Sequence, residues 1–119
     1  MAKPVGPYTP VVRAGDWLIV SGQVGIVDGK LVPGGMEAEL RQAMANLTGL
    51  LEANGAALAD VVKTTVFLRH LGSDYAAMNE AYIECFGDHR PARSAVGVAE
   101  LPLGALVEVE AWAFTRSGR

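Results

Sequence analysis

Residues 106–114 (LVEVEAWAF) alternate between two kinds of side chain, a pattern typical of a β-strand whose two faces meet different surroundings. One row is small and apolar: Val107, Val109, Ala111 and Ala113. The other row mixes bulky apolar groups with two carboxylates: Leu106, Glu108, Glu110, Trp112 and Phe114. The sheet that contains this strand therefore needs helices over its first face. Its second face is too apolar to be fully exposed to solvent and too charged to be buried in the core of one chain.

Two segments have the 3.6-residue spacing of helices that could cover the first face. The first ends at Asn54-Gly55, and its apolar stripe is Met36, Leu40, Ala43, Met44, Leu47, Leu50 and Leu51. The second is expected to open at Gly72-Ser73-Asp74, which supplies an N-cap, and to close at Gly87. Its stripe is Tyr75, Met78, Tyr82, Cys85 and Phe86, so Cys85 is expected to be a small core residue.

The remaining segments have the composition of β-strands. Residues 8–13 and 17–21 flank a turn and predict a hairpin, and a short strand is expected at residues 30–32 in the glycine-rich loop that follows. Residues 61–69 (VVKTTVFLR) predict a strand with one face made of Val62, Thr64, Val66 and Leu68. This order of elements predicts a single α+β domain over residues 1–119, in which two helices cover one face of a mixed sheet.

Residues 93–98 (RSAVGV) also alternate like a strand, but one of the two rows is unusual. Ser94, Val96 and Val98 form a row that is apolar enough to cover a core. The other row carries Arg93, followed only by Ala95 and Gly97, and we assign it to the same second face as Glu108 and Glu110. An arginine is rarely buried without an anion, because a stranded charge costs several kcal/mol. The partner of Arg93 is therefore elsewhere in the protein or arrives from outside.

Two interpretations of this second face are open. In the first, the face is buried against another copy of the chain, and its charges lie together in a cleft at the subunit interface. In the second, it is a solvent-exposed sheet face with a surface Arg–Glu pair that contributes little to stability. Trp112, Phe114 and the small residues Ala95 and Gly97 favour the oligomer. Space beside a fixed guanidinium also suits a small carboxylate, which an arginine can bind with two parallel hydrogen bonds.

Composition narrows the possible functions. The net charge is −3, the pI is about 5.3 and the basic residues are scattered, which argues against a surface that neutralises a nucleic-acid backbone. A single cysteine cannot form an internal disulfide, and the absence of a leader-like or membrane-spanning run leads us to expect a cytoplasmic protein. His70 and His89 lie 19 residues apart with no cysteine cluster, so no dedicated metal site is expected.

Six blocks of the chain together resemble one protein family. They are GPYTP (6–10), VSGQ (20–23), DVVKTTVFL (60–68), YAAMNEAY (75–82), PARSAV (91–96) and LPLGALVEVEA (101–111). In this order they resemble the reactive intermediate deaminase family, Rid/YjgF, also called the L-PSP family, over nearly the whole chain. The resemblance implies a chorismate-mutase-like homotrimer whose three clefts lie between subunits. It also implies hydrolysis of 2-imino or enamine acids to 2-keto acids and ammonia.

The resemblance also implies roles for five residues. Arg93 would bind the substrate carboxylate, and Glu108 would position or activate the water. Tyr8 and Ser21 would line the cleft, and Asn79 would support it. Each of these last three has a plainer interpretation, as a structural aromatic at a strand start, a strand-end hydroxyl and a helix-surface amide. Because an imine is already a strong electrophile, this hydrolysis needs a held substrate, a placed water and a proton acceptor, but no metal or organic cofactor.

The chain departs from the family pattern beside the arginine. Many members carry cysteine or threonine two residues after it and glutamate two further on, where this chain has Ala95 and Gly97. Proline often follows the motif SGQ(I/V), which is SGQV at residues 21–24 here, and this chain has Gly25 at the next position. These departures leave the cleft shape and the substrate range open. Two other functions also stay open, a non-catalytic trimer that binds a small keto or amino acid as a regulator, and RNA cleavage. In the catalytic interpretation Glu110 is assigned to an interface or to a salt bridge, with Arg93 itself as one candidate partner.

Overall fold

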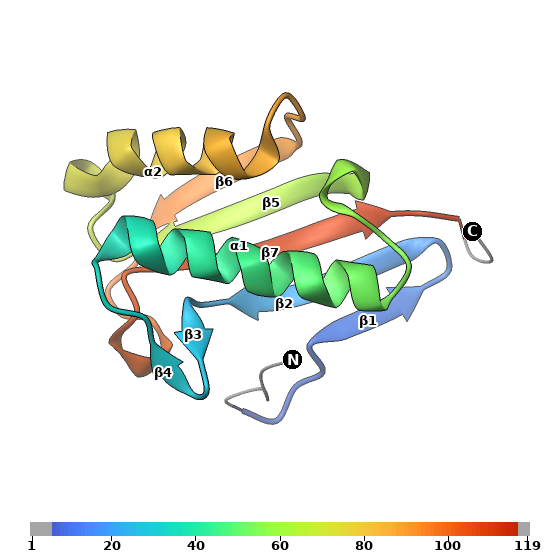
Figure 1. Cartoon of the computed structure of the whole chain (residues 1–119), viewed down its shortest axis with the longest axis horizontal. Helices are drawn as coiled ribbons and strands as arrows, with labels where there is room; N and C mark the ends of the chain where they lie inside the picture. The colour runs from blue at the N-terminus through green and yellow to red at the C-terminus, as the bar shows by residue number, and fades with distance from the viewer. Residues whose placement is uncertain (1–5, 117–119) are drawn as a thin grey trace.

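A five-stranded sheet forms the base of the computed structural model, which describes residues 6–116 (Figure 1). Its strands are β1 (Val11–Ala14), β2 (Trp17–Gln23), β5 (Val61–Leu68), β6 (Ala92–Gly97) and β7 (Val107–Phe114), in the spatial order β1-β2-β7-β5-β6. All neighbouring pairs are antiparallel except β5 and β6. Parallel neighbours need a crossover connection, and helix α2 (Leu71–Phe86) provides it.

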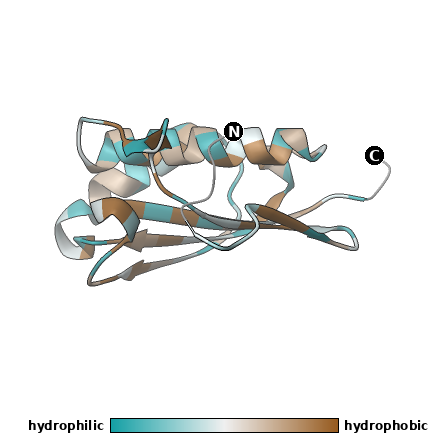
Figure 2. Ribbon diagram, turned by 90° about the horizontal axis from the view of Figure 1, so that it is seen from below, coloured by the Kyte–Doolittle hydropathy of each residue, from teal (hydrophilic) through white to brown (hydrophobic). Residues whose placement is uncertain are grey.

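Helix α1 (Met36–Ala53) and α2 lie side by side on one face of the sheet, and within residues 6–116 the other face carries no helix (Figures 1 and 2). All seven residues of the predicted α1 stripe are buried, as are Met78, Tyr82 and Phe86 of α2. Cys85 is half-buried and packs against the core, whereas Tyr75 is 44% exposed. The predicted α+β fold with two helices over a mixed sheet is confirmed.

The parity of β7 is also as predicted. Val107, Val109, Ala111 and Ala113 are fully buried beneath the helices. The side chains between them point to the helix-free face, which we call the open face, and there Trp112 and Phe114 are each 43% exposed. A small hairpin, β3 (Ile26–Val27) and β4 (Lys30–Leu31), follows β2, and single 3₁₀ turns lie at Leu58–Asp60 and Pro102–Gly104.

Three local predictions were wrong. The strand expected at residues 8–13 begins only at Val11. Helix α2 begins at Leu71 without a side-chain cap, because Ser73 and Asp74 already lie inside its first turn. Val62 is exposed and Val61 is buried, since the register between β5 and β7 shifts at this point and reverses the facing of the first residues of β5. Within residues 6–116, neither helix is both long and apolar enough for a membrane span.

Candidate functional site

The guanidinium of Arg93 is held by three side chains of α2. It lies 4.9 Å from the centre of the Tyr82 ring, which is within cation–π range. Its Nη2 donates to the hydroxyl of Tyr75 at 3.2 Å, and its Nη1 contacts Met78 Sδ at 3.7 Å. Tyr82 is itself fixed by a 2.7 Å hydrogen bond to the buried Thr64. Arg93 therefore has a defined position on a packed surface.

No carboxylate of residues 6–116 forms an ion pair with Arg93; the ion pair present there joins Arg41 and Glu84. Aromatic faces, a hydroxyl and a thioether satisfy the guanidinium only in part, because none of them carries a negative charge. A half-buried arginine that is held in place without an anion is a suitable receptor for an anionic ligand. The described part of one chain therefore contains no anionic partner for Arg93.

Arg93 does not share a face with the two glutamates. On the sheet it lies opposite Thr64 of β5, which in turn lies opposite Ala111 of β7, and these two neighbours are fully buried under the helices. Glu108 and Glu110 belong to the alternate row of β7 and point to the open face. The assignment of Arg93, Ala95 and Gly97 to the glutamate face was wrong, and Glu110 cannot pair with Arg93 of its own chain.

The error arose from the edge position of β6. Ser94 and Val96, predicted to cover the core, lie on the open face, where Val96 is 39% exposed and Ser94 accepts a hydrogen bond from Lys63. An edge strand is only partly covered by a helix, so its apolar row is not forced inward. Arg93 instead lies on the helix side, where it contacts aromatic side chains of α2.

The small residues after Arg93 also serve a different purpose from the one expected. A Cβ atom on Gly97 would lie 3.1 Å from the Cβ of Leu71, the first residue of α2. Gly97 thus allows the start of α2 to pack closely on β6, so on that side it leaves no empty volume for a ligand. Ala95, which is half-buried, lies between this contact and Arg93.

Glu108 is half-buried on the open face, at the end of β7 where Gly22 of β2 approaches it. Burial raises the pKa of the Glu108 carboxyl above its ordinary value of 4.5, and the nearby charge of Glu110 raises it further. A carboxylate with a raised pKa binds a proton more readily, which favours its use as a proton acceptor. This environment is suited to a general base.

An irregularity of β2 brings the backbone of Gly22 against this carboxylate. Val20 pairs with Ala111 and Gln23 with Val109, so β2 has one extra residue between these points and forms a bulge. A Cβ atom on Gly22 would lie 2.6 Å from Glu108 Cδ and 2.9 Å from its Oε2. Only glycine leaves room for the carboxylate here.

The three remaining predicted site residues lie in separate places. Ser21, at the bulge, donates its hydroxyl to the carbonyl of Thr9 at 2.7 Å, so it holds the segment before β1 against β2. Tyr8 is in that segment and is exposed. Asn79 is on α2, one helical turn after Tyr75, and its buried Oδ1 has no hydrogen-bond partner within the described chain. Arg93 and Asn79 thus belong to the helix side, and Glu108 and Ser21 to the bulge on the open face.

A family model described as "Endoribonuclease L-PSP" matches residues 1–115. The chain belongs to this family, also known as Rid/YjgF. A Mus musculus relative named 2-iminobutanoate/2-iminopropanoate deaminase is 44% identical over 109 residues, which are 90% of this chain and 80% of that protein. The resemblance read from the sequence is thereby confirmed.

Two solved structures of E. coli proteins support the Rid/YjgF fold. The crystal structure of the YjgF gene product has a TM-score of 0.88 at 39% identity and covers 95% of this chain and 91% of its own. The crystal structure of TdcF with bound serine has a TM-score of 0.87 at 34% identity, with 93% and 90% covered. At least one protein of this fold therefore holds a small amino acid.

Two residues at the site of this Rid/YjgF chain were not recognised from the sequence as site residues. Gly22 is in the VSGQ motif, directly after Ser21, so membership of that block was the signal that could have indicated it. Tyr75 was counted as part of the buried stripe of α2, yet it is exposed and contacts Arg93. Helical spacing predicts which side of α2 faces the sheet, but not how far each residue lies from the sheet edge. It therefore could not distinguish a buried core residue from an exposed residue beside Arg93.

Proposed function

We propose that this Rid/YjgF chain hydrolyses small 2-imino acids to 2-keto acids and ammonia, in clefts assembled between copies of the chain. The observation that carries the proposal is the pair of unlike groups described above, an arginine held without an anion and a half-buried carboxylate with a raised pKa. The name of the Mus musculus relative supports the same reaction.

The chemistry follows from the two groups. Arg93 binds the carboxylate of the substrate and thereby fixes the neighbouring C=N carbon. The imine reacts in its protonated form. A water molecule adds to the C=N carbon as Glu108 accepts one of its protons and the C=N electron pair moves to the positively charged nitrogen, which gives a neutral tetrahedral amino alcohol. Protonated Glu108 then returns the proton to nitrogen, the C–N bond breaks, ammonia leaves, and the remaining hydroxyl loses its proton as the keto group forms. No redox change occurs, and the net reaction consumes one water.

The site requires at least two copies of the chain. Arg93 and Glu108 are on opposite faces of one sheet, so they can meet the same small molecule only if the helix-side edge of one copy faces the open face of another. Such a contact joins two different surfaces, and it gives a closed ring when the rotation between neighbouring copies closes. The exposed Trp112 and Phe114 supply apolar area for that contact. We propose the homotrimer that the family resemblance implies.

A second candidate is a non-catalytic trimer that binds a small amino or keto acid as a regulator. The bound serine of the TdcF structure favours it, and Arg93 would serve it equally. Glu108 argues for catalysis, because a second negative charge beside a bound carboxylate weakens plain binding. RNA cleavage, the activity in the description of the family model, fits poorly with a net charge of −3 and scattered basic residues. The single-domain organisation and the cytoplasmic location stay predictions.

The deciding experiment generates imines from several amino acids with an amino-acid oxidase and follows their decay with and without the protein. We expect faster decay with the wild-type chain, loss of the acceleration in Arg93→Ala and Glu108→Gln, and the same rate after treatment with EDTA. Decay that is unchanged by the wild-type protein, while pyruvate still binds, would support the regulator instead. Activity that EDTA abolishes and zinc restores would contradict the cofactor-independent mechanism.

A further inference from the structure

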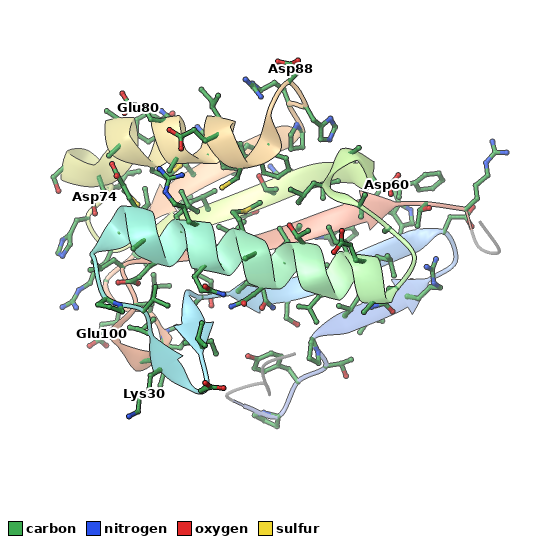
Figure 3. The ribbon with its side chains drawn as sticks, viewed as in Figure 1. Lys30, Asp60, Asp74, Glu80, Asp88 and Glu100 are labelled. Atoms are coloured by element: carbon green, nitrogen blue, oxygen red, sulfur yellow. The ribbon has the colours of Figure 1, made fainter. Side chains whose placement is uncertain are left out.

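Tyr75 lies beside Arg93 at an exposed position of α2. Asp74 and Glu80, labelled in Figure 3, bracket this part of the helix. The Tyr75 hydroxyl accepts a hydrogen bond from Arg93 Nη2 at 3.2 Å, and the guanidinium carbon lies 5.8 Å from the centre of the Tyr75 ring. With 44% of its surface exposed, Tyr75 is within reach of a ligand that approaches the arginine.

The direction of this hydrogen bond leaves the hydroxyl with a usable proton. A guanidinium can only donate, so the phenol oxygen must be the acceptor. The hydroxyl still has its own proton to donate, and no acceptor for that proton is described within residues 6–116. Accepting from a cation also polarises the O–H group, which makes it a stronger donor.

The second nitrogen of the guanidinium is only weakly engaged. Nη1 contacts Met78 Sδ at 3.7 Å, and a thioether sulfur is a poor acceptor. Met78 is fully buried, so its sulfur stays in place, but the guanidinium has five N–H groups and keeps donors for an arriving carboxylate while the Tyr75 hydroxyl and the Tyr82 ring hold it in position. Strong donors of both residues would then face the same carboxylate.

We propose that Tyr75 is a ligand-binding residue, whose hydroxyl donates to the substrate carboxylate beside Arg93 and selects for that group. This inference rests on the proposed function, since it assumes that Arg93 receives a carboxylate. It assigns Tyr75 to binding and leaves proton transfer to Glu108. A phenylalanine at this position would keep the ring over the guanidinium but lose both hydrogen bonds of the hydroxyl.

The test compares two variants that make the same chemical change. Tyr75→Phe removes the hydroxyl beside Arg93, and Tyr82→Phe removes a hydroxyl that bonds Thr64 inside the core. Pyruvate binding is measured by calorimetry for the wild type, both variants and Arg93→Ala, together with oligomer mass and melting temperature. The kinetics of 2-iminopropanoate hydrolysis are measured for the same four proteins.

We expect Tyr75→Phe to bind pyruvate about tenfold more weakly, as for loss of one hydrogen bond to a charged group, and to raise KM by a similar factor with kcat changed by less than about threefold. Its oligomer mass and melting temperature should match the wild type. Tyr82→Phe is the reference for a loss of α2 packing and should lower the melting temperature, because its hydroxyl is inside the core.

Three results would overturn the inference. If Tyr75→Phe binds pyruvate as the wild type does while Arg93→Ala does not, the carboxylate site exists without Tyr75. If Tyr75→Phe lowers the melting temperature as Tyr82→Phe does, its weaker binding comes from the packing of α2. If Arg93→Ala still binds pyruvate normally, or the wild type does not bind it, the carboxylate site of the proposed function is itself wrong.

Discussion

The backbone of Gly22 lies directly against the carboxylate of Glu108, so that a Cβ atom on residue 22 would be 2.6 Å from Glu108 Cδ. Real Cβ atoms do not approach other atoms this closely, so any larger residue at position 22 must move the glutamate. The bulge of β2 and the position of the proposed base are therefore one structural feature.

Gly22→Ala should consequently lower kcat. A shift of about 1 Å in a base costs on the order of 10- to 100-fold in rate, whereas pyruvate binding at Arg93 should change little. Gly49→Ala is the matched control, because a Cβ at this position of α1 has nothing within 4 Å and alanine favours the helix. Equal turnover in Gly22→Ala and the wild type would show that the Glu108 position is not critical.

Arg93→Lys should fail nearly as badly as Arg93→Ala. Lysine keeps the charge but loses the planar fork that holds a carboxylate and stacks on Tyr82. Hydrogen bonds to charged groups contribute about 1.5–3 kcal/mol each, so we expect a loss of roughly tenfold to a hundredfold or more in kcat/KM. Steady-state kinetics on 2-iminopropanoate check this, and near-normal activity of the lysine variant would mean that Arg93 only attracts the substrate.

The two glutamates should differ in their effects on catalysis and on its pH dependence. Glu108→Gln should lose roughly 10²-fold or more in turnover and still bind pyruvate, because it keeps the shape and removes the base. Glu110→Gln removes a charge that raises the pKa of Glu108, so the acidic limb of the pH–rate profile should move to lower pH with the activity retained. Selective loss of catalysis in Glu110→Gln, with assembly intact, would transfer the role of base to that residue.

Glu108→Gln should also stabilise the protein at neutral pH. The folded-state pKa of Glu108 is raised, so this group contributes stability at low pH and loses that contribution as pH rises through the folded-state pKa. A neutral glutamine avoids the loss. Melting temperatures measured from pH 4 to pH 8 should show the variant above the wild type near pH 7, with the difference shrinking toward the ordinary value of 4.5. A variant less stable than the wild type at pH 7 would contradict this.

Mixing two inactive variants tests whether Arg93 and Glu108 come from different copies. In a ring of unlike contacts, each site takes one residue from each neighbour, so equal amounts of Arg93→Ala and Glu108→Gln refolded together should recover about a quarter of wild-type activity. Each variant refolded alone should stay inactive. Sites contained within one chain would give no recovery, because every chain in the mixture lacks one of the two groups.

The strands and helices of the interior were predictable because burial of one face of each element sets the spacing of its apolar residues. The parity of β7 is fixed by helices over one face, and the stripe of α1 by its contact with the sheet, so Val107 and Leu47 are found where their spacing requires. The fold needed no information beyond hydrophobic periodicity and the turn residues.

The arrangement of the site was less predictable. Arg93 is on an edge strand, where neither row of side chains must be buried. On the helix side it contacts aromatic side chains of α2, and one of them, Tyr75, is 18 residues before it in the sequence. The bulge at Gly22 inserts one residue, and alternation alone gives no sign of such an insertion. Sequence blocks identified the residues, but the three-dimensional contacts decided which of them can meet.

Because Arg93 and Glu108 point to opposite faces of the sheet, the proposed activity of this protein should depend on its concentration. An isolated chain has each half of the proposed site but never a whole one, so its specific activity should depend on mass action among the copies. Dilution below the dissociation constant of assembly would silence it without unfolding it. A substitution on the open face far from any ligand, at Trp112 for example, would then lower the activity because fewer complete rings would form.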